Sequence, residues 1–184
     1  NYDIINTNIN RVAPDDPKPL IEYIAERGQR LRDTLSNLGV DCADISYPLS
    51  ENDLVINEFM ASSDNLSGVE EPDGGTPDWI ELHNNTNSDI TIDKHYYLSD
   101  DKDFPKKWNF PEEVIIPADG YLIVWADKDV HQQEIHAGFK IEKDGGDLLM
   151  TYENMTEIQN ISYGNQILNQ GYARFPNGTG DFVI

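Results

Sequence analysis

From Leu54 onward the sequence predicts an all-β domain, a sandwich or a barrel, on two observations. First, short runs rich in β-branched and aromatic residues follow one another at residues 54–59, 79–84, 90–92, 96–98, 114–116, 121–126, 137–141, 147–152, 157–162 and 172–175. Second, turn-forming segments separate these runs, among them Asp73-Gly74-Gly75 and Pro176-Asn177-Gly178. No interval between the runs has helical periodicity, so a fold of alternating strands and helices is excluded.

The first 48 residues differ in character from the rest of the chain. Prolines 14, 17 and 19 prevent a helix before residue 18. Apolar residues then recur near the helical period, which predicts one amphipathic helix over 18–38, ended by Gly39: Leu20, Ile24, Leu31, Leu35 and Leu38. We therefore expect an N-terminal extension over 1–48, made of this helix and a linker, followed by a β-sandwich over 54–184.

Charge and composition exclude several classes of partner. The chain has 13 basic and 34 acidic residues, a formal net charge of −21. Nucleic acids and anionic membrane surfaces need a basic face, and no stretch supplies one. No apolar run is long enough to span a membrane. The single cysteine, Cys42, cannot form an internal disulfide.

The order of segments resembles the lamin tail domain family in its bacterial form, over about residues 54–182. The matching segments are 56–62, 78–84, 97–101, 108–111, 116–126, 139–140 with 146–147, 163–164 and 172–178. This resemblance implies an immunoglobulin-like antiparallel β-sandwich, in front of which the helical period places the N-terminal helical extension. It also implies an accessory module of an exported or cell-surface protein. The DNA affinity of some animal lamin tails does not transfer to so acidic a chain.

The predicted helix over 18–38 has a resemblance of its own. It is similar to the last helix of spore-coat-protein-H-like kinase domains, through Tyr23-Ile24, Arg27, Leu31 and Leu35. The nucleotide and metal motifs of such a kinase are not in this chain, so no catalytic residue is carried over.

Catalytic motifs are missing from the sequence, which predicts a protein that is not an enzyme. It has no nucleophile elbow, phosphate-binding glycine loop or Cys/His zinc spacing. Glu58 and Glu81 fall inside predicted strands, as does Arg174, and a carboxylate among apolar neighbours needs a partner. We therefore expect a structural ion pair between Arg174 and Glu58 or Glu81, in preference to an acid/base pair.

Acidic loops and tryptophans suggest two kinds of ligand. Residues 61–77 form a long acidic loop, in which Asp64, Asp73 and Asp78 are candidate ligands for Ca²⁺, with a merely solvated loop as the alternative. Trp79, Trp108 and Trp125 fit either a glycan-stacking platform or core packing, and core packing is favoured. The four histidines are scattered and are expected to be structural or exposed rather than ligands.

These observations predict a noncatalytic interaction or spacer module of a larger exported or cell-surface bacterial protein. Its partner is expected to be a protein or another component of the cell envelope, with no nucleic acid and no membrane insertion. The alternative is a calcium- or glycan-binding accessory module of a surface enzyme.

Overall fold

A computed structural model describes residue 34, residues 49–64 and residues 69–184. The extension over 1–48, with its predicted helix, lies outside the described residues except for Thr34, which is helical. None of the described helical structure is long and apolar enough to cross a lipid bilayer. From Leu54 onward the regular structure is all strand, which confirms the predicted fold class.

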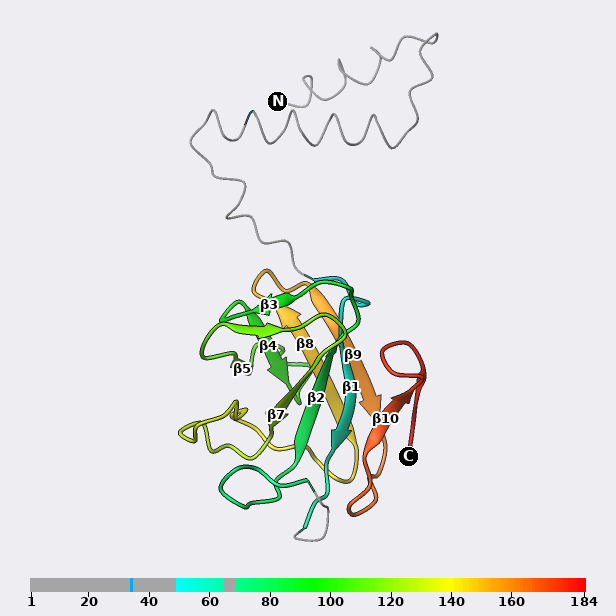
Figure 1. Cartoon of the computed structure of the whole chain (residues 1–184). Helices are drawn as coiled ribbons and strands as arrows, with labels where there is room; N and C mark the ends of the chain where they lie inside the picture. Colours follow the sequence, from blue (N-terminus) through cyan, green and yellow to red (C-terminus); the bar gives the residue numbers. More distant parts are fainter. Residues whose placement is uncertain (1–33, 35–48, 65–68) are drawn as a thin grey trace. The chain divides into compact units, whose positions relative to one another are not determined.

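Two antiparallel sheets form the sandwich (Figure 1). The five-stranded sheet has the order β11-β10-β1-β2-β7, built from β1 (Leu54–Met60), β2 (Trp79–Asn84), β7 (Tyr121–Trp125), β10 (Tyr172–Phe175) and β11 (Asp181–Val183). The four-stranded sheet has the order β5-β4-β8-β9, built from β4 (Tyr96–Ser99), β5 (Trp108–Asn109), β8 (Gly146–Tyr152) and β9 (Glu157–Tyr163). A short ribbon pairs β3 (Ile90–Ile92) with β6 (Val114–Ile116).

The hydrophobic core lies between the two sheets because alternate residues of each strand face the same way. Ile80 and Leu82 of β2 are fully buried, as their spacing predicts, and Phe59 of β1 is buried with them. The ring of Phe59 packs against that of Tyr163 in β9, with centroids 4.7 Å apart, so it joins the two sheets. Burial of this apolar surface is the main stabilising contribution to the domain.

A smaller apolar cluster lies on the outer face of the five-stranded sheet. Trp79 of β2 pairs with Trp125 of β7 and with Met60 of β1, so the three share one face. All three are buried, and Val69 and Ile123 pack against them. Burial of Trp79 and Trp125 confirms core packing for these two residues, while Trp108 is partly buried and packs against Phe110.

The strand pattern differs from the prediction in three places. Residues 137–141 bury Ala137, Phe139 and Ile141 alternately, as a strand would, but they make one isolated bridge, from Lys140 to Asp127, and no continuous ladder. The short strands β5 and β11 were not predicted. The burial of side chains follows the two-residue period of the sequence. A ladder of backbone hydrogen bonds also needs a neighbouring strand in register, and the sequence of one segment does not specify that neighbour.

Candidate functional site

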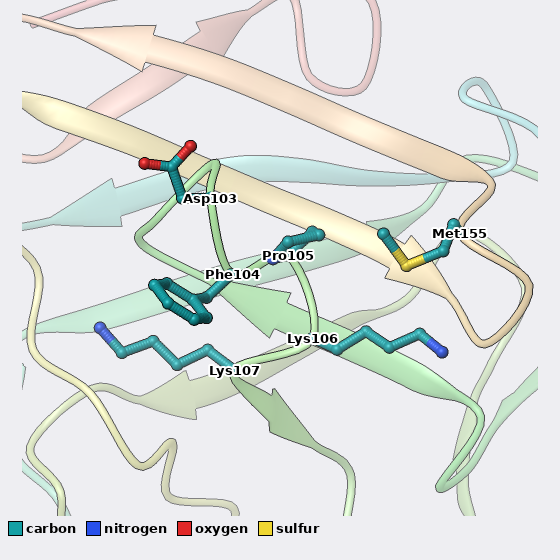
Figure 2. Close-up of a pocket in the computed structure, with 6 residues that line it drawn as sticks. All are labelled: Asp103, Phe104, Pro105, Lys106, Lys107 and Met155. Atoms are coloured by element: carbon teal, nitrogen blue, oxygen red, sulfur yellow. The ribbon is translucent and has the colours of Figure 1, made fainter.

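The loop between β4 and β5 carries an exposed apolar surface. Phe104 is 67% exposed and Met155, from the turn between β8 and β9, is 56% exposed. With Pro105 they line an open, mostly apolar hollow of about 540 Å³. A group of exposed apolar side chains around a hollow is a candidate binding surface. This hollow, lined by Asp103, Phe104, Pro105, Lys106, Lys107 and Met155, is called the Phe104 hollow below (Figure 2).

Buried hydroxyl groups hold this loop in one conformation. Ser99, at the end of β4, is fully buried, and its Oγ donates to the Phe104 carbonyl at 2.8 Å. The same Oγ accepts from the amide of Asp101 at 3.0 Å. Thr151 of β8 donates to the Pro105 carbonyl at 2.9 Å. The apolar side chains of the hollow are therefore displayed on a fixed backbone, which lowers the entropic cost of binding.

Two lysines give the rim of the Phe104 hollow a basic character. Their side chains extend in opposite directions along the hollow (Figure 2). Lys106 bonds to the Glu153 carbonyl and Lys107 pairs with Asp100. Asp103 is the one carboxylate in the lining, so the hollow carries less negative charge than a chain of net charge −21 would suggest.

The architecture agrees with a comparison against known families. The model of the lamin tail domain matches residues 48–165, which is well over half of the chain. The chain belongs to the lamin tail domain family. Strands β10 and β11 of this lamin tail domain lie beyond the matched range and complete its five-stranded sheet. A search of curated proteins finds no match to the chain. Lamin tail domains are immunoglobulin-like modules that often mediate interactions.

The lamin tail domain arranges the predicted ion-pair residues differently from the expectation. Arg174 donates from Nε to the Ile56 carbonyl at 3.0 Å, from Nη1 to the Gly180 carbonyl at 3.0 Å and from Nη2 to Gln159 Oε1 at 3.3 Å. No described salt bridge joins Arg174 to Glu58 or Glu81. The expected pair is therefore corrected: carbonyl and amide oxygens, not carboxylates, satisfy the guanidinium.

Successive side chains of a strand point to opposite faces of the sheet, and this alternation explains why Arg174 does not meet the two glutamates. Phe59 pairs with Tyr172 across β1 and β10, and their rings meet edge to face in the core. Arg174, two residues after Tyr172, lies on that inner face, while Glu58, next to Phe59, lies on the outer face. Glu81 accepts from Asn57 Nδ2 at 2.8 Å, where β1 has a bulge. The sheet itself separates the arginine from both glutamates.

The three candidate calcium ligands are not brought into one cluster. Asp64 accepts from Asn169 Nδ2 at 2.7 Å, which joins the loop after β1 to the segment before β10. Asp73 is exposed and accepts from the Gly75 amide within its own turn. Burial raises the pKa of Asp78 to about 6, against the opposing effect of Lys140. Among the described residues, Asp64, Asp73 and Asp78 form no group close enough to hold one ion, so the expectation of a site shared by these three is corrected.

A different group of ligating side chains does converge in the lamin tail domain. Among the described residues, Glu71, Asp127 and His136 form one set whose ligating atoms all lie within 4.8 Å of one another. Glu71 comes from the predicted acidic loop, but Asp127 follows β7 and His136 is one of the scattered histidines. Sequence reasoning missed this set because its members are far apart in the chain and belong to no spacing motif.

Proposed function

We propose that this lamin tail domain is a noncatalytic interaction module of a larger exported or cell-surface bacterial protein, and that its Phe104 hollow is the binding surface. The observation that supports this most directly is the exposure of Phe104 and Met155 on a backbone fixed by buried Ser99 and Thr151. The bacterial form of the family resemblance and the acidic composition support the exported setting.

The chemistry of the hollow favours one kind of occupant. An apolar side chain such as Leu or Phe fits between Phe104 and Met155, because both present apolar surface that water otherwise covers. A carboxylate beside that apolar side chain would meet Lys106 and Lys107 at the rim. We therefore propose a segment of a partner protein in which an apolar residue is flanked by Asp or Glu.

A noncatalytic role is supported by the placement of the two strand glutamates. Glu58 and Glu81 lie opposite each other on adjacent strands, and neither lines the Phe104 hollow. Paired carboxylates that cleave a substrate must stand on either side of the bond that breaks, with room for it between them. Neither Glu58 nor Glu81 lines either of the two pockets described in this domain, where such a substrate could lie.

Amide chemical-shift mapping with two synthetic peptides tests the proposal. One peptide carries Leu and Phe flanked by Glu, and the matched peptide has Lys in place of each Glu. The acidic peptide should shift the amides of residues 101–104, 106–107 and 153–156 and bind at least about tenfold more tightly than the basic one, a difference of about 1.4 kcal/mol. Equal shifts spread over the whole surface would contradict the proposal.

Two substitutions complete the test. Phe104→Ser and Met155→Ser should each weaken binding of the acidic peptide while leaving the melting temperature unchanged, because both side chains are largely in water. Phe175→Ser is the matched control, since Phe175 is 77% exposed and lies outside the hollow. If Phe175→Ser weakens binding as much as Phe104→Ser, the hollow is not the binding surface.

A further inference from the structure

The cluster of Glu71, Asp127 and His136 lies where two loops meet beside the outer apolar cluster of Trp79 and Trp125. Glu71 is held by its own turn, in which its amide donates to the Gly75 carbonyl at 2.9 Å and its carbonyl accepts from the Gly74 amide at 2.9 Å. Asp127 comes two residues after Trp125, and His136 makes a parallel bridge with Trp125 itself. The backbone therefore fixes all three positions.

The geometry brings one imidazole nitrogen to both carboxylates. His136 Nδ1 lies 3.1 Å from both carboxylate oxygens of Asp127 and 3.9 Å from Glu71 Oε2. The side chain of His136 is 1% exposed, that of Glu71 is 7% and that of Asp127 is 13%. Three ligating groups from separate parts of the chain thus meet at one largely buried point.

Glu71 supplies the observation that points to a ligand. Its Oε2 atom is buried and has no hydrogen-bond partner among the described residues, although it faces His136. A buried carboxylate oxygen without a partner is costly. No described salt bridge brings a lysine or arginine to Glu71 or Asp127, so neither of these residue types neutralises the two carboxylates.

We propose that Glu71, Asp127 and His136 bind a divalent metal ion of the zinc class. Two carboxylates and one imidazole are ligands that Zn²⁺ accepts, and three protein ligands leave a fourth position for water or for a partner's side chain. Ca²⁺ is disfavoured, because it takes six to eight oxygen ligands and histidine nitrogen is not among them. The ion would join the loop that follows β1 to the segment that follows β7.

The competing explanation is an internal ion network, in which a protonated His136 neutralises the two carboxylates. The two explanations predict opposite effects of Glu71→Gln on the metal-free protein. In a network, removing one carboxylate lowers stability, because an attraction is lost. In an empty metal site, the same change removes an uncompensated buried charge, so stability stays the same or rises.

Titration of tag-free, chelator-treated protein with Zn²⁺ alone provides the first test. Calorimetry should show one site per chain, and millimolar Zn²⁺ should raise the melting temperature by about 5 °C or more through mass action. Ca²⁺ at the same concentration should raise it by much less. Absence of both binding heat and a melting shift with Zn²⁺ would overturn the proposal, and a larger response to Ca²⁺ would overturn the choice of metal class.

Substitution of each ligand provides the second test. Glu71→Gln, Asp127→Asn and His136→Ala should each weaken Zn²⁺ binding at least about tenfold. Each has an exposed control of the same residue type close to it in the chain: Glu70→Gln, Asp129→Asn and His131→Ala, respectively. The proposal is overturned if the control variants lose Zn²⁺ as readily as the ligand variants.

Two further readouts keep the test informative if a ligand variant folds poorly. Co²⁺ in place of Zn²⁺ should give visible absorption bands of a four-coordinate site in the native protein, and Asp127→Asn or His136→Ala should remove them. Glu71→Gln should retain or raise the melting temperature without metal while losing the Zn²⁺ response. A melting temperature that falls in metal-free Glu71→Gln, together with no cobalt bands in the native protein, would establish the ion network instead.

Discussion

Glu58 and Glu81 lie directly opposite each other on β1 and β2, on the face of the sheet away from Arg174. Burial raises the pKa of Glu58, and the charge of Glu81 raises it further. Opposed like charges destabilise a strand pair. The side chain of Asn57 relieves part of this repulsion, because its Nδ2 donates to Glu81 Oε1.

Glu58→Gln should stabilise the protein by about 0.5 kcal/mol near neutral pH, because it removes one of two opposed charges. The pKa of Glu58 is higher in the folded state than in the unfolded state. The contribution of the protonated Glu58 side chain to stability is therefore fully present below the unfolded-state pKa, and it is lost as pH rises through the folded-state pKa. The gain should therefore vanish below about pH 4. Urea unfolding at several pH values measures it, with exposed Glu113→Gln as the control. A loss of stability at neutral pH would show that Glu58 has an attractive partner.

Asp78→Asn should also stabilise the protein in a pH-dependent way, and its gain in stability should appear at higher pH than that of Glu58→Gln. Burial raises the pKa of Asp78 to about 6 from an ordinary value of 3.8. Ionisation of Asp78 therefore lowers the stability of the folded state as pH rises through about 6. The variant should gain about 1 kcal/mol at pH 8 and nothing below about pH 4, after allowance for partial solvent screening. Carbon-13 NMR titration of the Asp78 carboxyl checks the pKa directly, and Asp144→Asn is the exposed control. An Asp78 pKa near 4 would contradict this prediction.

Arg174→Lys should lower the free energy of unfolding by about 2 kcal/mol, although charge is conserved. The guanidinium donates to three acceptors at once, from Ile56, Gln159 and Gly180, and its Cζ atom lies 4.5 Å from the centroid of the Phe182 ring. A lysine ammonium cannot reproduce this planar set of donors. Denaturant unfolding measures the loss, and Lys94→Met is a control at an exposed cation. A loss below about 0.5 kcal/mol would mean that these bonds are not stabilising.

Asn84→Asp should be among the most damaging single-atom changes in the domain. The Nδ2 atom of the fully buried Asn84 lies 2.8, 2.9 and 2.9 Å from the carbonyls of Ser88, Ile116 and Pro117, so its two N–H groups are shared among three acceptors. Replacing this amide nitrogen with oxygen turns three attractions into repulsions, so we expect a loss of at least about 3 kcal/mol. Thermal unfolding checks it, with Asn85→Asp as the neighbouring control. Similar melting temperatures for the two variants would contradict the assigned role of Asn84.

Much of the fold could be predicted because burial in a strand repeats every second residue. Ile80 and Leu82 are buried as that period requires, and most of the predicted runs are strands in the structure. The order of segments also indicated the lamin tail family, which the match over residues 48–165 confirms. The Phe104 hollow was not predicted, because the sequence does not show which side chains the loop between β4 and β5 exposes.

The residues within each strand, and the faces they bury, were thus determined by the sequence alone, because neighbours along the chain set them. Which distant residues meet was decided only by the tertiary structure. The pairing of β1 with β10 puts Arg174 and Glu58 on opposite faces, and the approach of two loops brings Glu71 to Asp127 and His136. Strand pairing and loop packing arise from contacts between segments far apart in the chain, and no local period records such contacts.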